Sequence, residues 1–281
     1  NVIKILSEEE VTQSRLNIED ELLSREVSFE QSRQAILNVF RQFSTEAYSH
    51  ALLCSLIAQG PANMYLSGEN LYPLIEQLLP YTLLVSLKIP LKQKLFPYKE
   101  HFIQQTLMQV SERPTYVVVD FTDLGAGKIG EEEIITLKLL KVFVEDGQLN
   151  YRWEYGESFV KIDCSGIVAR GSSIIKPNIT AKNQKITLEA IPKLSEDELW
   201  RFRTYLAHCR KTLNNVEIST ETAEKIKDDF LQERQEKGEA ISGDLLNLRL
   251  LLTRLDCASR GSTSVLYEGY TQAKQLLNEL I

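Results

Sequence analysis

The chain has 281 residues, of which 43% are hydrophobic and 25% are charged, which is the composition of an ordinary globular protein. No apolar run of about eighteen residues occurs, so the sequence predicts no membrane span. The formal net charge of −7 argues against direct nucleic-acid binding, because nucleic-acid binders usually carry a basic field, and it favours a protein partner. No signal peptide is visible, and since the chain begins with Asn1 rather than Met, we expect that an upstream portion is missing.

The cysteines and histidines are scattered along the chain and form no Cys-x-x-Cys pair and no pair of ligands at helical spacing. This distribution indicates buried free thiols in a reducing compartment, and it predicts no metal site. The residues concerned are Cys54, Cys164, Cys209 and Cys257, together with His50, His101 and His208.

Residues 1–27 are charged and mixed in pattern, and we interpret them as the remnant of an upstream region or a linker. A helical pattern begins at Ser28, because apolar residues then recur at a spacing that places them on one face of a helix. A second helix is predicted over residues 45–58 and ends at Gly60-Pro61. The apolar face of the first helix consists of Phe29, Ile36, Leu37, Phe40 and Phe43.

From residue 63 to residue 170, predicted strands alternate with predicted helices. The run Tyr116–Asp120 is rich in β-branched residues, which is typical of a strand buried on both faces. This alternation predicts an α/β domain with a mostly parallel sheet, over residues 28–191. The expected strands are 63–66, 82–89, 116–120 and 166–170, and the expected helices are 70–79, 99–110 and 131–144.

A β-hairpin is predicted within this region, because residues 149–155 and 158–163 both alternate between apolar and polar side chains. Gly156-Glu157 is the expected turn.

The composition changes after about Ile191, and the remaining residues, 192–281, are predicted to form a helical subdomain. Ser195 and Glu198 have the spacing of a capping box, which opens a helix that extends to about Lys211. Three more helices are predicted to begin at Ser219, Ser242 and Ser264. The expected apolar face of the first of these is Ala223, Ile226, Phe230 and Leu231.

Two segments invite comparison with nucleotide-binding motifs. Gly125–Ile129 contains a Gly-Lys pair, but a phosphate-binding loop also needs a glycine five residues earlier and a hydroxyl after the lysine, to bind the phosphates and magnesium. Thr122 and Ile129 occupy those positions, so a surface turn is the favoured interpretation. Asp120 ends an apolar strand, as the magnesium-binding aspartate of a Walker-B element does, but Phe121 follows it.

The order of these elements resembles an MCM-type AAA+ module that has lost its catalytic residues. Met64–Gly68, followed by the helix 70–79, resembles the place of the phosphate loop, but no Gly-Lys-Ser is present. Tyr116–Asp120 resembles the Walker-B strand, and the predicted hairpin resembles the one that precedes sensor 1. Ile167–Gly171 resembles the sensor-1 strand without its asparagine.

The C-terminal helices resemble the MCM lid, most clearly at Leu252–Ala258. Asn247 falls near the expected sensor-2 arginine, and residues 172–194 show no arginine-finger motif. Over residues 28–281 the chain is similar to the MCM complex-binding protein family, although Phe121 stands where that family tends to have glutamate. The segments that carry this similarity are 64–68, 71–76, 96–100, 118–124, 202–206 and 228–234.

The resemblance implies a degenerate AAA+/MCM-like core, a helical lid and a nuclear protein that associates with MCM helicase subunits. It implies roles in the handling of MCM subcomplexes, their release from chromatin, DNA replication and sister-chromatid cohesion. It also implies no catalytic residue, no cofactor and no metal, with Asp120 as a non-functional remnant.

Two alternatives stay open. One is a divergent AAA+ nucleotide hydrolase that uses Asp120 and Lys128, and the other is a DNA-binding hairpin that uses Arg152 and Lys161. The acidic residues Glu154, Glu157 and Asp163 roughly balance the charge of that hairpin.

Overall fold

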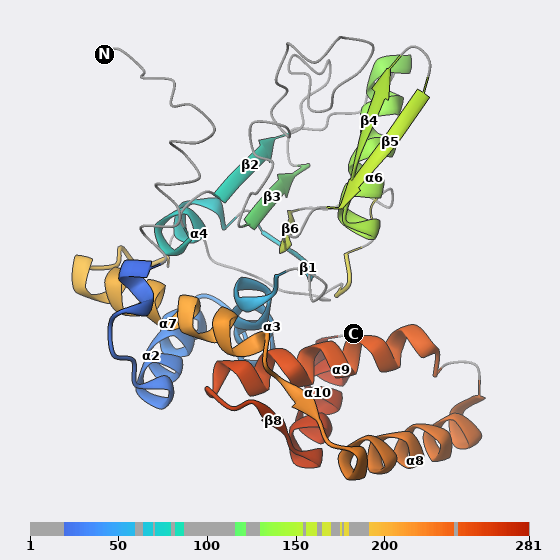
Figure 1. The fold of residues 1–281 in the computed structure, drawn as a ribbon. Coiled ribbons are helices and arrows are strands. Elements are labelled where there is room, and N and C mark those ends of the chain that lie inside the picture. Colours follow the sequence, from blue (N-terminus) through green and yellow to red (C-terminus); the bar gives the residue numbers. More distant parts are fainter. Residues whose placement is uncertain are drawn as a thin grey trace.

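The computed structural model has a mixed α/β fold that is mostly helical (Figure 1). It describes residues 20–59, 64–69, 71–79, 82–86, 116–121, 130–153, 156–161, 165–169, 175, 177–179, 191–238 and 241–280. The predicted helix 99–110 lies outside these residues, as do residues 125–129 and Cys164.

A four-stranded parallel sheet confirms the prediction of a parallel α/β architecture. Its strand order is β1-β6-β3-β2, so β3 lies in the interior and is buried at all five positions, as its β-branched run predicted. Beyond β1, the N–H of Ser67 donates to the carbonyl of Ile179 at 2.8 Å, which extends the sheet by one parallel bridge. The strands are β1 (Tyr65–Gly68), β2 (Thr82–Ser86), β3 (Tyr116–Asp120) and β6 (Ser165–Ala169).

Helix α3 (Glu46–Ile57) is the centre of the helical part of the molecule. It packs against β1, β6 and four helices, and ten of its twelve residues are buried. Because neighbours surround most of its circumference, the helix buries polar residues as well as apolar ones. Ser55 shows the consequence, since its hydroxyl is hydrogen-bonded to the hydroxyl of Tyr116 in β3. The surrounding helices are α2 (Phe29–Arg41), α7 (Glu196–Leu213), α9 (Gly243–Ser259) and α10 (Tyr267–Leu280).

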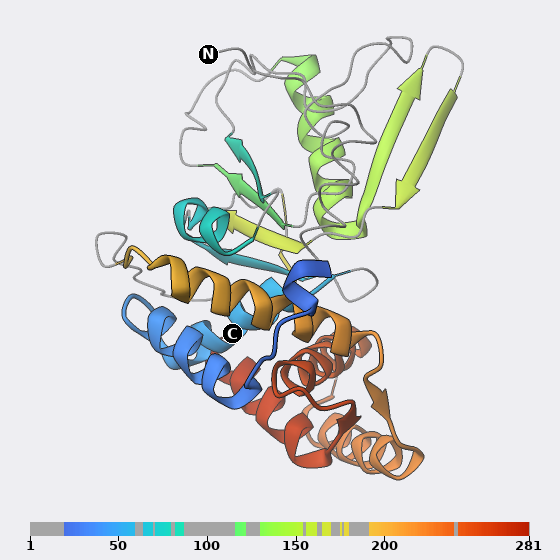
Figure 2. The same ribbon diagram turned by 60° about the vertical axis from the view of Figure 1, so that its left-hand side comes forward.

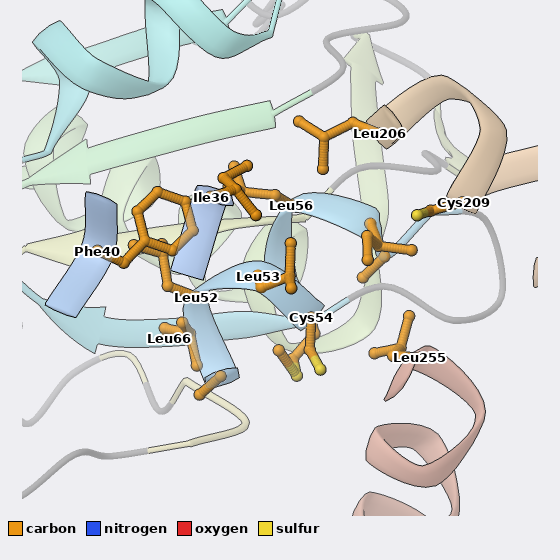
Figure 3. Close-up of a cluster of buried hydrophobic side chains, with 14 of the residues drawn as sticks. Ile36, Phe40, Leu52, Leu53, Cys54, Leu56, Leu66, Leu206, Cys209 and Leu255 are labelled. Carbon is orange, nitrogen blue, oxygen red and sulfur yellow. The ribbon is translucent and has the colours of Figure 1, made fainter. Parts of the chain in front are cut away.

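One continuous apolar core joins the sheet to the helices (Figure 3). Side chains from α2, α3, β1, α7 and α9 meet in it, among them Ile36, Leu53, Leu66, Leu206 and Leu255. The predicted thiols are confirmed as buried and free at Cys54, Cys209 and Cys257. Burial raises the pKa of all three, to about 12 for Cys209, so these thiols are protonated and unreactive at neutral pH.

Helix α6 (Glu131–Asp146) and the hairpin of β4 (Gln148–Trp153) and β5 (Gly156–Lys161) lie at one end of the molecule (Figures 1 and 2). Gly147, with a φ of 63°, ends the helix in the left-handed conformation and turns the chain directly into β4. The predicted turn at Gly156-Glu157 was wrong, because Gly156 pairs with Trp153 and Glu157 pairs with Arg152, so both residues belong to the ladder.

Serine side chains begin three of the C-terminal helices, as predicted. Ser195 and Glu198 form a capping box at α7, and the hydroxyls of Ser219 and Ser242 accept backbone N–H groups at the starts of α8 (Thr220–Lys237) and α9. The prediction failed at Ser264, which lies in the short strand β8 (Ser264–Val265), paired with β7 (Glu217–Ile218).

The predicted apolar face of α8 was partly wrong. Leu231 is 44% exposed, and the buried positions are Ile226, Phe230 and the charged Glu233. The short helix α4 (Tyr72–Leu78) packs on β2 and α7. None of the described helices is long and apolar enough to cross a bilayer.

A buried polar junction connects the N-terminal helices to α9. The Arg33 guanidinium donates to the Asp256 carboxylate at 2.8 Å and to the Ser259 hydroxyl at 2.9 Å. At the same place, Gly261 has a φ of 72°, and a Cβ there would lie 2.6 Å from the ring of Phe29. Glycine is therefore required for both its conformation and its small size.

Candidate functional site

The carboxyl ends of the parallel strands form the edge at which open α/β sheets usually bind ligands. Asp120 lies at this edge, in register with Ser86 of β2 and Ala169 of β6. The sequence predicted this placement at the end of a buried strand. The side chain is buried, and it shares a face of the sheet with Tyr116 and Val118, which belong to the apolar core.

The residue after Asp120 is also buried. The N–H of Phe121 donates to the carbonyl of Ala169 at 3.1 Å, so the backbone continues to pair with β6 beyond the end of β3. An apolar side chain therefore fills the position at which a second carboxylate would activate water in a hydrolase.

The connection from β1 to α4 is short. Only residues 69–71 separate the end of β1 at Gly68 from the start of α4 at Tyr72. A phosphate-binding loop needs eight residues of glycine-rich motif, which this connection cannot hold. Tyr48 of α3 is buried, and no residue in the described part of the chain forms a hydrogen bond with its hydroxyl. Burial, with a smaller contribution from the charge of Glu69, raises the pKa of Tyr48.

The helical region carries a buried ion-pair network that the sequence did not reveal. The Arg249 guanidinium binds both carboxylate oxygens of Glu233, at 2.7 and 3.3 Å, and Lys274 joins the same carboxylate at 2.9 Å. Lys274 also binds Asp229 at 2.7 Å, so the network ties α8 to α9 and α10. Asn247, near the expected sensor-2 position, is exposed, whereas Arg249 two residues later is committed to this network.

The lowered pKa of Glu233 leads to a specific prediction of how stability depends on pH. The Arg249 hydrogen bonds lower its pKa from 4.5 to about 2. A carboxyl group whose pKa is depressed by folding stabilises the protein above its unfolded pKa and loses this contribution as pH falls through the folded pKa. At about pH 6 the contribution is about 3 kcal/mol, and about 2 kcal/mol of it is lost by about pH 3.

We therefore expect the difference in unfolding free energy between the wild type and Glu233→Gln to narrow between about pH 6 and about pH 3. Urea titration of both proteins at both pH values measures this difference in unfolding free energy. A difference that stays constant over this range would contradict the role of the Glu233 charge.

A pocket of about 230 Å³ lies between α3, α9 and α10. Beside it, the Arg33 guanidinium lies 3.3 Å from Nδ1 of His50, and His50 Nε2 lies 3.0 Å from a carboxylate oxygen of Glu46. Because arginine can only donate, Nδ1 accepts and Nε2–H donates to Glu46, which makes His50 neutral. Burial, together with the charge of Arg33, lowers the pKa of His50, in agreement with this assignment.

The other sequence-predicted positions are not gathered at one site. Arg152 and Lys161 lie on β4 and β5 of the hairpin. Lys128, which the hydrolase hypothesis needs, lies outside the described residues. Within the described part of the chain, no group of three or more histidine, cysteine, aspartate or glutamate side chains could hold a metal ion.

Comparison with known proteins identifies one family. The family model described as "Mini-chromosome maintenance replisome factor" matches residues 53–279. Curated proteins named "Mini-chromosome maintenance complex-binding protein" match as well. The Gallus gallus protein is 26% identical over 229 residues, which cover 74% of this chain and 35% of that protein.

Two further relatives carry the same name. The Salmo salar protein is 25% identical over 77% of this chain and 36% of its own length, and the Homo sapiens protein is 24% identical over 74% and 34%. This chain thus spans about a third of the length of these relatives. The family match extends from α3 through the sheet to α10 and confirms the resemblance read from the sequence, and the chain therefore belongs to the mini-chromosome maintenance (MCM) complex-binding protein family.

Proposed function

We propose that this chain is a non-catalytic protein that associates with MCM helicase subunits. In this proposal it regulates their assembly, stability or release from chromatin during DNA replication and sister-chromatid cohesion, and it acts in the nucleus. The observation that carries the proposal is the family match over residues 53–279, with relatives whose name states that they bind the MCM complex.

The order of the strands supports an AAA+-like origin for the sheet. In AAA+ modules the sensor-1 strand lies between the phosphate-loop strand and the Walker-B strand. Here β6, which resembles the sensor-1 strand, lies between β1 and β3, which resemble the other two. The hairpin β4–β5 is inserted directly before β6 in the chain, as the MCM hairpin is before sensor 1.

Three features of the described residues support a role without nucleotide hydrolysis. The β1–α4 connection is too short for a phosphate loop, Phe121 follows Asp120, and Arg249 is held by Glu233. Phosphoryl transfer depends almost wholly on positioned charges around the phosphates. A protein of this kind would dock beside MCM subunits as a scaffold or chaperone and would not complete an ATP-hydrolysing ring.

Affinity purification from an extract of proliferating cells tests the association. We expect this protein to retain a subset of MCM subunits, identified by mass spectrometry, in the presence and in the absence of ATP. Recovery of no MCM subunit by correctly folded protein would contradict the proposal.

Isothermal titration with Mg-ATP separates the proposal from the divergent hydrolase. We expect no specific ATP binding by the wild type, and Asp120→Ala should leave MCM association unchanged, because no step of the proposed function uses that carboxylate. Tight ATP binding that Asp120→Ala abolishes would support the hydrolase instead.

A further inference from the structure

Helix α7 lies between the sheet and the other C-terminal helices (Figure 2). It packs against α3 and α4, the two helices that precede and follow β1 in the chain, and it also packs against α9 and α2. The helix therefore contacts both the part of the chain that carries the sheet and the part that resembles a lid.

Two arginines of α7 bind the carboxyl-terminal ends of α3 and α4. Arg203 donates from Nε and Nη2 to the carbonyl of Gln77 in α4, at 2.9 and 2.7 Å. Arg210 donates from the same two nitrogens to the carbonyl of Leu56 in α3, at 3.2 and 2.7 Å. These carbonyls lie in the last turns of their helices, where carbonyl groups lack partners within the helix and favour a nearby cation.

The spacing of these arginines lets one helix reach both sites. Seven residues separate Arg203 from Arg210, which is nearly two helical turns, so both side chains leave the same face about 10 Å apart along the axis. Tyr205 lies about 200° around the helix from Arg203, and its buried hydroxyl donates to the carbonyl of Ser259 in α9 at 2.7 Å. Helix α7 is thus hydrogen-bonded on one face to the helices beside the sheet and on the opposite face to α9.

Apolar contacts reinforce these hydrogen bonds. The buried side chains of α7 belong to the same continuous core as those of α3, β1 and α9. The segment that enters α7 packs on this core too, since Leu194 is 6% exposed and Ile191 is partly buried against it. Separate domains usually move relative to one another unless a large apolar interface joins them. Because the sheet and the C-terminal helices share one apolar core, they meet that exception.

We propose that α7 is a clamp that fixes the C-terminal helices to the sheet, so that they do not open and close as a hinged lid. Arg203 and Arg210 set the orientation of α7 on α3 and α4, and Tyr205 fixes α9 to α7 in that orientation. The chain therefore presents one fixed surface to a partner. The clamp does not depend on the proposed function, and only its expected behaviour in a complex does.

The distance between α4 and α9 tests the clamp. Spin labels are attached at Glu76→Cys of α4 and Asn247→Cys of α9, which are exposed positions, and double electron–electron resonance measures their separation. The three described native thiols are buried, and Cys164→Ser is present in every protein compared, so labelling is confined to the two introduced cysteines.

We expect the labelled protein to give one narrow distance distribution, which shifts by less than about 2 Å when a purified MCM subunit binds. Arg203→Ala combined with Arg210→Ala should broaden the distribution about twofold, because bodies joined by a weakened interface move relative to one another. Lys211→Ala, which removes an exposed cation from the same helix, should leave the distribution unchanged.

Thermal unfolding monitored by circular dichroism establishes whether the double variant is folded. A second distance in the labelled protein, a larger shift on binding, or an unchanged distribution in the folded double variant would overturn the inference. If the double variant does not fold, the measurements on the protein without it still decide between a clamp and a hinged lid. Absence of any complex with an MCM subunit would instead overturn the proposed function, and the distances in the free protein would still test the clamp.

Discussion

Replacement of Arg249 by alanine is expected to lower the free energy of unfolding by about 3–5 kcal/mol. Arg249 is buried, and its guanidinium binds both oxygens of the buried Glu233 carboxylate at 2.7 and 3.3 Å. Removal of one member of a buried ion pair leaves the other charge desolvated and without its main partner. Because Lys274 and Lys237 still contact Glu233, we expect the lower end of this range.

Lys237→Ala is the matched control for this prediction. Lys237 binds the same carboxylate at 2.9 Å, but its side chain is 57% exposed. Exposed ion pairs contribute about 0–1 kcal/mol, so this variant should remain close to the wild type. Chemical denaturation monitored by circular dichroism compares the two, and equal losses of stability would show that burial of the Arg249–Glu233 pair is not what matters.

Arg33→Ala is expected to cost about 2–4 kcal/mol, because it removes the cation at the buried junction of α2, α3 and α9. The guanidinium satisfies Asp256, Ser259 and His50 together. His50 belongs to α3, whereas Asp256 and Ser259 belong to α9. Arg33 and Asp256 are 223 residues apart in sequence, so the Arg33 side chain links two distant parts of the chain. The change should therefore loosen α9 and not only α2.

Arg260→Ala is the control, since Arg260 binds the same Asp256 carboxylate at 2.8 Å from a side chain that is 45% exposed. We expect a loss below about 1 kcal/mol for this variant. Hydrogen exchange should show faster exchange in both α2 and α9 for Arg33→Ala and in neither helix for Arg260→Ala. Unchanged exchange in α9 after Arg33→Ala would contradict the account of the junction.

Local features of the fold could be predicted because their causes are local. A run of β-branched residues predicted the buried strand β3, and serine hydroxyls predicted the starts of α7, α8 and α9. The hairpin was predicted, but its turn was misplaced, because Gly156 pairs with Trp153 in the ladder and does not turn the chain.

Features that depend on distant residues could not be predicted in this way. Leu231 has the periodicity of a core residue, yet α8 has too few neighbours to cover it. The partners of Arg33 and Arg249 lie on other helices, and a sequence does not state which charged residues become buried together. Glu233 and Asp229, four residues apart on α8, were the available signal, since residues at this spacing share one helix face.

The candidate site was predicted in part. Asp120 lies where the sequence placed it, at the carboxyl end of a buried strand. Strand β1 ends at Gly68, two residues beyond the predicted end of the strand. The pocket between α3, α9 and α10 has no sequence signature, because its walls come from three helices that only the fold brings together.

The most direct test of the central claim is reconstitution of this protein with purified MCM subunits, followed by mass photometry with and without ATP. The account predicts a stable complex with at least one MCM subunit, of equal affinity in both conditions, because the β1–α4 connection is too short for a phosphate-binding loop. Absence of a complex with every subunit, or a complex that forms only with ATP bound to this chain, would contradict the account.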